Sequence, residues 1–328
     1  MAGQVWGTDS LGGNLAQDYL TKYLRYVAQP LTRFRQICDV KEAIGKKRGD
    51  TFNWDVIANI GTAGGTLTET SVIPSAEFTV TKGTGTVYEF GNSIPMTRKV
   101  KELSQHDVHD IIRKTLANDM VKTIDKYIWT QVKSTQLIFL PSAGTSTTSI
   151  EIDTNGTCGT ASNATAGLTY NHVIEIVAAM KEYNIPTFDG ENYLCITHPS
   201  TLTKIRKDLV SLQNYTESGR TQFLNGEVGK IEGMRFVEQT NISKVTPTNA
   251  GSGVGWAAFF GGEAMIEAIS VPEQIIEKEV TDYGRSMGLA WYMIAGYTPA
   301  FPVSTYTNNR IALWWPNAEV VADDTTAV

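Results

Sequence analysis

The longest run of helical periodicity, residues 104–133, constrains the fold of this chain more than any other segment. It opens on Ser104-Gln105-His106-Asp107, the pattern of a capping box, in which side chains satisfy the free backbone N–H groups of a first helical turn. Apolar residues then recur every three or four positions: Val108, Ile111, Ile112, Leu116, Met120, Ile124, Tyr127, Ile128 and Val132. At 1.5 Å per residue the segment predicts a helix about 45 Å long, whose apolar stripe other elements must cover.

The segment before this helix, residues 49–95, has the period of a β-strand. Phe52 and Trp54 alternate with polar neighbours, and the alternation returns around Phe78. The Gly-rich run 61–66 between them predicts the flexible tip of a long hairpin. Two strands alone are only marginally stable in water, so the aromatic face needs a cover, which either the same chain or another subunit supplies.

Residues 1–48 predict an arm with one short helix. Apolar residues at helical spacing precede Pro30: Leu15, Tyr19, Leu20, Tyr23 and Leu24. Two interpretations of this stripe stay open. The helix packs on its own domain, or it docks as an arm on a neighbouring subunit.

The second half of the chain alternates short helices and strands. Residues 134–168 are rich in Ser, Thr, Gly and Asn around one strand at Ile150–Ile152, and they predict a surface insertion. From Trp256 to the end the pattern is mainly that of strands. No internal repeat is visible.

Composition excludes several classes of protein. The chain is 41% hydrophobic and 19% charged, as in ordinary globular proteins, and no apolar run approaches the ~18–20 residues that cross a bilayer. The three cysteines, Cys38, Cys158 and Cys195, are odd in number and widely spaced, which disfavours a disulfide framework and a structural zinc site. A net charge of −6 without a dense basic stripe makes tight duplex binding a poor candidate function.

Candidate catalytic residues are few. His106 and His109 stand beside two aspartates, but imidazoles at i and i+3 need a third metal ligand from elsewhere, so we interpret them as part of an acidic first helical turn. His198 precedes Pro199, a pair typical of a structural turn at a helix start. No serine or cysteine lies in a nucleophile-elbow setting. We therefore expect no catalytic residue, metal or cofactor.

The most specific motif lies at residues 226–243. Glycines at 226, 229 and 233 lead into a short extended run, Met234–Gln239, which ends at the turn signal Thr240-Asn241. The preceding segments come in a fixed order: a helix from 168 to 183, a strand at 192–196, and a helix start at Thr197-His198-Pro199. This order and spacing resemble the major capsid proteins of tailed bacteriophages, and the match extends over roughly 95–270.

The resemblance implies an α+β chain with the Hong Kong 97 capsid fold. Its expected parts are an N-terminal arm (1–48), an extended β-hairpin loop (49–95), a spine helix with the first part of a peripheral domain (96–168), an axial domain (169–275) and a return to the peripheral domain (276–328). The chain beginning at Met1 is expected to be the mature one.

The resemblance also implies function. The protein is expected to self-assemble, as pentamers and hexamers, into the icosahedral shell that encloses the double-stranded DNA of a tailed phage, without sequence-specific DNA binding and without a membrane. Scaffolding, portal and cement proteins are the other implied partners, and the virion, assembled in the bacterial cytoplasm, is the implied location. Six residues are expected at subunit interfaces: Tyr19, Tyr23, Phe52, Trp54, Phe78 and Glu69.

Two alternatives remain at this point. An encapsulin-like nanocompartment has the same fold but encloses a protein cargo. A soluble metal-dependent enzyme would use His106 and His109. Particles that contain DNA and a portal would exclude the first, and the absence of stoichiometric metal would exclude the second.

Overall fold

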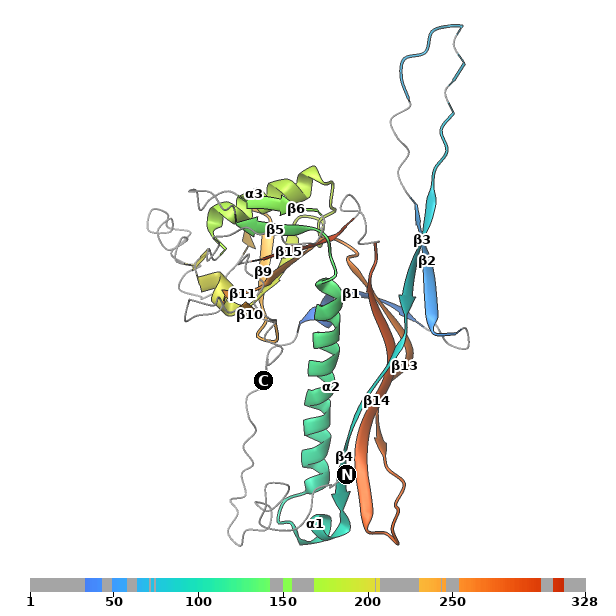
Figure 1. Ribbon diagram of the computed structural model, residues 1–328, viewed down its shortest axis with the longest axis vertical. Helices are drawn as coiled ribbons and strands as arrows, with labels where there is room; N and C mark the ends of the chain where they lie inside the picture. Colours follow the sequence, from blue (N-terminus) through green and yellow to red (C-terminus); the bar gives the residue numbers. More distant parts are fainter. Residues whose placement is uncertain are drawn as a thin grey trace.

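The structure is a computed structural model that describes residues 33–42, 49–57, 64–70, 72–73, 75–141, 150–154, 168–203, 205–206, 230–242, 244–245, 254–301 and 309–315. Two larger β-sheets, one long helix and a projecting two-stranded hairpin are the main features of these residues (Figure 1). The predicted helix with Tyr19 and Tyr23, and the glycines at 226 and 229, lie outside the described residues.

The larger sheet has seven strands in the order β6-β5-β15-β12-β7-β9-β8. The strands are β5 (Ile138–Pro141), β6 (Ile150–Asp153), β7 (Tyr193–Thr197), β8 (Lys230–Ile231), β9 (Met234–Glu238), β12 (Ala257–Phe260) and β15 (Ile311–Trp314). All residues of β5, β7, β12 and β15 are buried. Short, continuously apolar runs such as Ala-Ala-Phe-Phe are typical of strands covered on both faces.

The two faces of this sheet belong to different hydrophobic clusters. Alternate residues of β12, Ala257 and Phe259, pack in a cluster with the helix α3 (Tyr170–Glu182), whereas Ala258 and Phe260 pack in a cluster with the C-terminal part of the helix α2 (Val108–Val132). This division follows from the period of two in a strand. The sheet is therefore the middle layer between α3 and the upper end of α2 (Figure 1).

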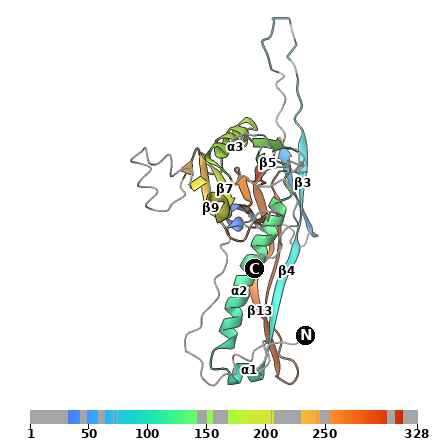
Figure 2. The same ribbon diagram turned by 60° about the vertical axis from the view of Figure 1, so that its left-hand side comes forward.

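The second sheet has the order β1-β13-β14-β4 and runs along α2. β1 (Cys38–Glu42) pairs in parallel with β13 (Met265–Glu277), and the long ribbon of β13 and β14 (Ser286–Pro299) continues antiparallel to β4 (Tyr88–Thr97). Every second residue of β14 is buried in the cluster that α2 shares: Leu289, Trp291, Met293, Ala295 and Tyr297. Figure 2 shows helix and sheet side by side over most of their length.

The predicted long helix is confirmed, but it begins later than expected. Asp107 is the N-cap of α2, and its carboxylate accepts from the backbone N–H groups of His109 and Asp110. Ser104 instead ends a separate short helix, α1 (Arg98–Leu103), which Thr97 caps. A carboxylate at N-cap satisfies the first free N–H groups by itself, so the expected capping box does not form. Six of the nine stripe residues are buried: Val108, Ile112, Leu116, Ile124, Ile128 and Val132.

The predicted hairpin is also confirmed. β2 (Thr51–Ile57) pairs antiparallel with β3 (Val80–Thr86), in a register that places Phe52 opposite Gly85 and Trp54 opposite Gly83. The second strand was expected around Phe78, but pairing starts at Val80. The hairpin extends away from both sheets at one end of the molecule (Figure 1).

Two expectations about chain organisation need correction. Residues 137–141 are not part of a surface insertion, because β5 is buried inside the seven-stranded sheet between β6 and β15. The sheets also divide the chain differently from the expected domain ranges. β15 lies in the same sheet as β7 and β9, although it was assigned to the returning segment 276–328, and β13 enters the other sheet already at Met265.

The motif region folds largely as predicted. β8 and β9 are joined by a two-residue turn, in which both Glu232 and Gly233 have positive φ (48° and 79°). Such a turn favours glycine, which adopts positive φ without a Cβ clash. The remaining described elements are the 3₁₀ helix η2 (Phe34–Ile37), helical residues 199–203 and 205–206, and the small pair β10 (Lys244–Val245) and β11 (Val254–Gly255).

Candidate functional surface

A buried carboxylate in α2 holds the segment through which the N-terminal part of the chain enters the body. Asp125 accepts hydrogen bonds from the backbone N–H groups of Arg33 (3.1 Å) and Phe34 (3.0 Å), and from the side-chain amides of Gln239 and Asn241. Burial raises the pKa of Asp125 to about 6, although these hydrogen bonds favour the charged form. One side chain thus joins η2, α2 and the turn after β9.

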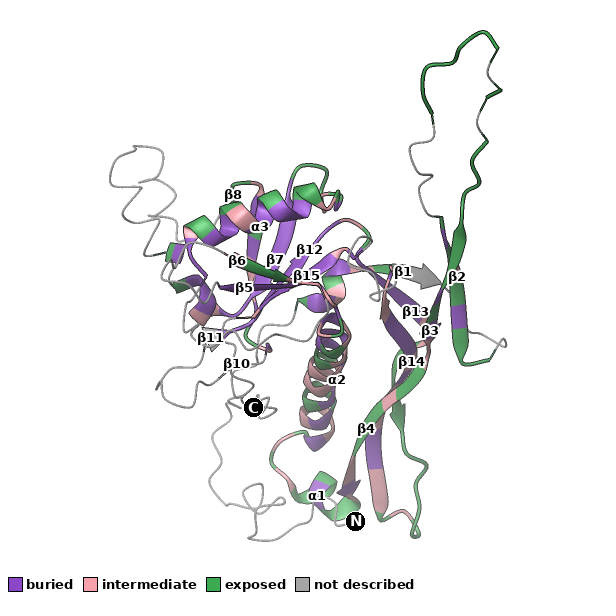
Figure 3. Cartoon of the chain, turned by 45° about the horizontal axis from the view of Figure 1, so that its top comes forward, coloured by how far each residue is buried: buried purple, intermediate pink, exposed green. Residues whose placement is uncertain are grey.

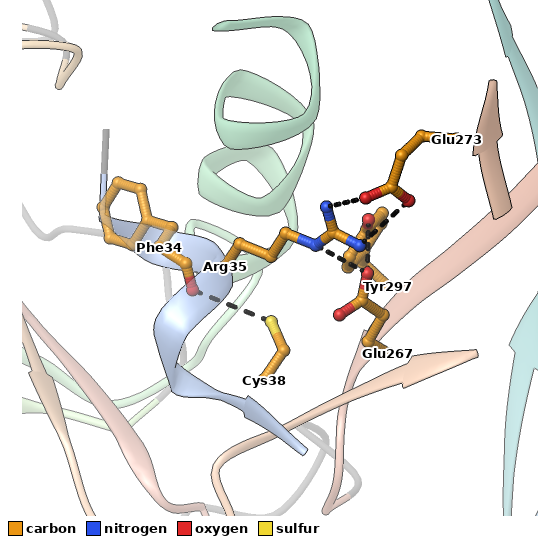
Figure 4. Close-up of polar contacts among 6 residues, drawn as sticks. All are labelled: Phe34, Arg35, Cys38, Glu267, Glu273 and Tyr297. Atoms are coloured by element: carbon orange, nitrogen blue, oxygen red, sulfur yellow. Dashed lines mark hydrogen bonds and ion pairs between the residues drawn. The ribbon is translucent and has the colours of Figure 1, made fainter. Parts of the chain in front are cut away.

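A second polar cluster fixes the same segment to the four-stranded sheet (Figure 4). The Arg35 guanidinium contacts Glu267 through Nε (2.9 Å) and Glu273 through Nη1 (3.1 Å), and the Tyr297 hydroxyl donates to Glu267 (2.8 Å). Burial lowers the pKa of Arg35, but the bonded Glu273 and the charge of Glu267 outweigh this and raise it overall. Glu267 is buried and therefore needs these partners. Together with Asp125, the cluster fixes η2 both to α2 and to the four-stranded sheet, whose edge strand β1 follows η2 directly.

The hairpin is the most exposed apolar element among the described residues. Val72, Ile73 and Phe78 have exposed fractions of 91%, 73% and 61%, and Leu67, Val80 and Ile57 are exposed too. Figure 3 shows the projecting part almost entirely in the colour of exposed residues. Soluble monomers rarely leave a contiguous group of large apolar side chains in water, so such a group indicates a binding surface.

The opposite end of the molecule carries a second, smaller exposed group. The turn between β13 and β14 presents Val280 and Tyr283 to solvent, and Ile275 and Ile276 are exposed on the adjoining strand. Tyr283 has a positive φ of 51°, which a non-glycine residue rarely adopts. Exposed apolar side chains therefore lie on the elements at both ends of the long axis (Figure 1).

The histidines that suggested chemistry have structural contacts. His109 Nε2 lies 3.0 Å from Glu277 Oε1, which links the start of α2 to the end of β13. His198 Nδ1 accepts from the backbone N–H of Ser200 (3.1 Å) in the turn after β7. Within the described ranges, no group of three His, Cys, Asp or Glu residues could hold a metal ion, and none of the helices is long and apolar enough to span a bilayer.

A sequence profile decides the family. The profile of the phage capsid protein family matches residues 81–308, which is more than half of the chain. This chain belongs to the phage capsid protein family. The matched range includes α2 and every strand of the two larger sheets except β1 and β15, so the family signal lies in the body that carries the projecting hairpin.

Solved structures show that this capsid protein has the fold of tailed-phage shells. It matches the capsid of cyanophage P-SCSP1u with a TM-score of 0.65 and 12% identity, covering 94% of this chain and 96% of that chain. The capsid of Ralstonia phage GP4 matches with a TM-score of 0.64 and 14% identity, covering 95% and 99%. The capsid of Helicobacter pylori phage KHP30 matches with a TM-score of 0.64 and 12% identity, covering 94% of this chain and 98% of that chain. No curated protein sequence matches the chain.

The expected Hong Kong 97 capsid fold is therefore confirmed. The chain is a structural component of a phage capsid, a major capsid protein that associates with itself in the shell of the virion. Neither the nanocompartment nor the metal-dependent enzyme is favoured.

The expected interface residues fall into two groups in this capsid protein. Phe78 and Glu69 are exposed on the hairpin. Phe52 is only 3% exposed, because it packs against Ile266, Ala268 and Ala300 of its own chain. The expectation that the Phe52 ring is buried between subunits is thus corrected.

Trp54 is half-buried, and it also contacts the body of its own chain. Its indole N–H donates to the carbonyl of Ala300 (2.7 Å). The two aromatic residues at the root of the hairpin therefore pack mainly within the chain.

Sequence reasoning missed Asp125 and Arg35, which anchor the entering segment of the capsid protein. A signal for Asp125 was available. It precedes Ile128, Trp129 and Val132 by three, four and seven positions, so it lies on the buried side of α2. Arg35 carried no comparable signal, because its partners Glu267 and Glu273 are more than 230 residues away.

Proposed function

We propose that this capsid protein builds its shell through the exposed hairpin, which covers a neighbouring copy in pentamers and hexamers of a closed icosahedral particle. The observation that carries the proposal is the apolar group of Val72, Ile73 and Phe78, which the described part of the same chain leaves in water. Covering one large apolar side chain contributes about 1.5–3 kcal/mol. Three such side chains on every copy therefore favour association strongly when many copies assemble.

Rings of five or six identical copies require contacts between unlike surfaces of neighbouring copies. A body with two anchored sheets supplies a rigid unit, and the hairpin supplies an extension that reaches beyond it. We further propose that residues 1–48 extend as an arm beneath another neighbour. Support comes from the buried Asp125 and the half-buried Arg35, which fix the end of that segment to the body.

The interior contents and accessory partners belong to the same proposal. The shell encloses double-stranded DNA without recognising its sequence, consistent with a net charge of −6 and the lack of a dense basic stripe. Portal, scaffolding and cement proteins complete the particle, assembly takes place in the bacterial cytoplasm, and the subunit performs no catalysis.

The alternatives make different predictions. A nanocompartment built from the same fold would enclose protein instead of DNA. An enzyme based on His106 and His109 would bind metal, but His109 already pairs with Glu277 on the described surface. Nucleic-acid content of native particles and elemental analysis of the pure protein separate these cases.

Assembly of the purified protein tests the central claim. Size-exclusion chromatography with light scattering, followed by negative-stain microscopy, should show rings or closed shells at raised protein concentration. A variant with Val72, Ile73 and Phe78 all changed to Ser should remain folded but stay unassembled. A wild-type chain that stays monomeric at every concentration, also with partner proteins from its phage, would contradict the proposal.

A further inference from the structure

The root of the hairpin has an unusual construction, in which two aromatic rings lie against three glycines. We call Phe52, Trp54, Gly83, Gly85 and Gly296 the aromatic joint. Phe52 and Trp54 are neighbours on one face of β2, with ring centroids 5.6 Å apart. Gly83 and Gly85 face them across the ribbon, and Gly296 belongs to β14 of the body.

Each of these glycines leaves space that a ring occupies. A Cβ on Gly83 would lie 2.2 Å from Trp54 Cε2, and a Cβ on Gly85 would lie 2.4 Å from Phe52 Cζ. A Cβ on Gly296 would lie 2.9 Å from Phe52 Cε1 and 2.6 Å from the carbonyl oxygen of Thr86. No side chain fits at these distances, so the Phe52 ring is held between the hairpin and the body.

A directional contact completes the joint. Trp54 Nε1 donates to the carbonyl oxygen of Ala300 at 2.7 Å, immediately after β14 ends. Beyond this point the ribbon has no pairing with either sheet, since β2 and β3 form a separate two-stranded sheet in the described part of the chain. Ile57, at the outer end of β2, is already exposed. The joint and the chain continuing from β3 into β4 are therefore the contacts that relate the hairpin to the body.

We propose that the aromatic joint sets the direction in which the hairpin leaves the body, and that Trp54 is its positioning residue. The physical reason is that the hairpin is long compared with its root. A small rotation at the root becomes a large displacement at Val72 and Ile73, which lie in the segment that connects the outer ends of β2 and β3. The single hydrogen bond to Ala300 and the ring packing on Gly83 restrict that rotation, as packed residues do at a hinge.

This inference rests on the proposed function, because direction matters only if the tip must reach a neighbouring copy. The joint differs from the tip in what it contributes. Phe78, Val72 and Ile73 supply apolar surface to a contact, whereas Trp54 determines where that surface lies.

The test measures the direction of the hairpin in unassembled subunits. Spin labels are attached at Thr66→Cys on the hairpin and Glu182→Cys on α3, in a background with Cys38→Ser and Cys158→Ser, and the buried Cys195 is retained. Pulsed electron paramagnetic resonance then gives the distribution of distances between the labels. The variants are Trp54→Phe, which keeps a ring but removes the donor, and Gly83→Ala, which displaces the ring. Gly65→Ala is the matched control, because a Cβ there meets no atom within 4 Å.

We expect a narrow distribution for the wild type and for Gly65→Ala, and a shifted or broader one for Trp54→Phe and Gly83→Ala, with unchanged circular dichroism. Should Gly83→Ala lose strand pairing, Trp54→Phe decides. A distribution for Trp54→Phe equal to that of the wild type, or a wild-type distribution as broad as that of the variant, would overturn the proposal.

Assembly is the second readout. Trp54→Phe should yield fewer closed shells and more irregular aggregates than Gly65→Ala, and normal shells from Trp54→Phe would also overturn the proposal. If the wild type gives the expected narrow distribution but never assembles, the proposed function fails while the joint stands. The two claims are thus tested separately.

Discussion

Two antiparallel ribbons of this protein have similar alternating sequences but different surroundings. The ribbon of β13 and β14 has α2 along one face, β1 on one edge and β4 on the other. Among the described residues, the ribbon of β2 and β3 packs on the body at its root, where Phe52 and Trp54 lie, and its outer part is exposed. The alternation of apolar and polar residues therefore predicts a ribbon, but it does not predict whether the same chain covers its apolar face.

The difference assigns distinct tasks to the two ribbons. Alternate residues of β14 are buried in the main core, so this ribbon is part of what makes the subunit fold. Large apolar side chains of the described hairpin stay in water, and in our proposal a neighbouring copy covers them. Substitutions in the core around β13 and β14 should affect folding, whereas substitutions in the outer hairpin should affect assembly.

The largest expected effect is the loss of folding when a residue in the core that covers β13 and β14 is changed. Leu116 lies in α2 with no exposed surface, inside the core shared with the four-stranded sheet. Leu116→Asp places an unpaired charge there, which costs several kcal/mol out of a total stability of roughly 5–15 kcal/mol. We expect loss of soluble folded protein, measured by expression and circular dichroism. Val121→Asp, on the exposed side of the same helix, is the control and should fold. Soluble, normally assembling Leu116→Asp would show that the stripe faces no core.

Substitutions of two phenylalanines test the difference between the root of the hairpin and its exposed part. Phe52→Ala empties a buried site next to Ile266 and should lower the free energy of unfolding by about 3 kcal/mol, as in other buried Phe to Ala changes. Phe78→Ala removes a ring that is already in water and should leave that free energy nearly unchanged while reducing assembly. Urea unfolding and sedimentation velocity measure the two effects. Equal losses of folding stability would abolish the distinction.

The pH dependence of Asp125 sharpens the account of the anchored segment. Its folded pKa of about 6 lies above the ordinary value of about 3.9, so the folded chain holds the proton more tightly than the unfolded chain. The resulting stabilisation is complete below about pH 4 and is lost as the pH rises through about 6, amounting to about 1–3 kcal/mol. The difference in unfolding free energy between wild type and Asp125→Asn should fall accordingly over this window.

Asp110 provides a control of opposite sign. Lys114 holds the pKa of its carboxylate below the usual range, so its contribution is present above the ordinary pKa and is lost as the pH falls. The difference in unfolding free energy between wild type and Asp110→Asn should therefore rise with pH. A difference for Asp125→Asn that does not change with pH would show that folding does not raise the pKa of Asp125.

The smallest effect on folding is expected from removing the outer hairpin. Deletion of residues 58–74, with a short turn joining the strands, retains Phe52 and Trp54 at the root and removes Val72 and Ile73. The thermal midpoint should stay close to that of the wild type, because the described residues among those removed, 64–70 and 72–73, are all exposed. Sedimentation velocity should show monomers that assemble poorly. Normal shells, or global unfolding measured by circular dichroism, would each contradict the division between the ribbons.

The sequence by itself determined the elements whose periodicity is strong. The 3.6-residue period of α2, the alternation in β2 and the order of motifs from 168 to 243 predicted the helix, the hairpin and the family fold. These signals are local, since a helix or a half-covered strand repeats its burial along a short stretch of chain. The start of α2 was missed by a few residues, because both Ser104 and Asp107 can cap a helix and the sequence does not choose between them.

Only the tertiary structure decided which of these elements are covered, and by what. β5 shows no alternation because it is buried on both faces, and so its four residues were read as surface. Asp125 meets Arg33 and Gln239 across 92 and 114 residues, and Phe52 meets a glycine of β14, so none of these contacts is visible in a local pattern. Phe52 and Phe78 look alike in sequence, yet one is buried and the other exposed. The physical reason is that periodicity reports the geometry of one segment, whereas burial depends on which distant segments, or which other copies, pack against it.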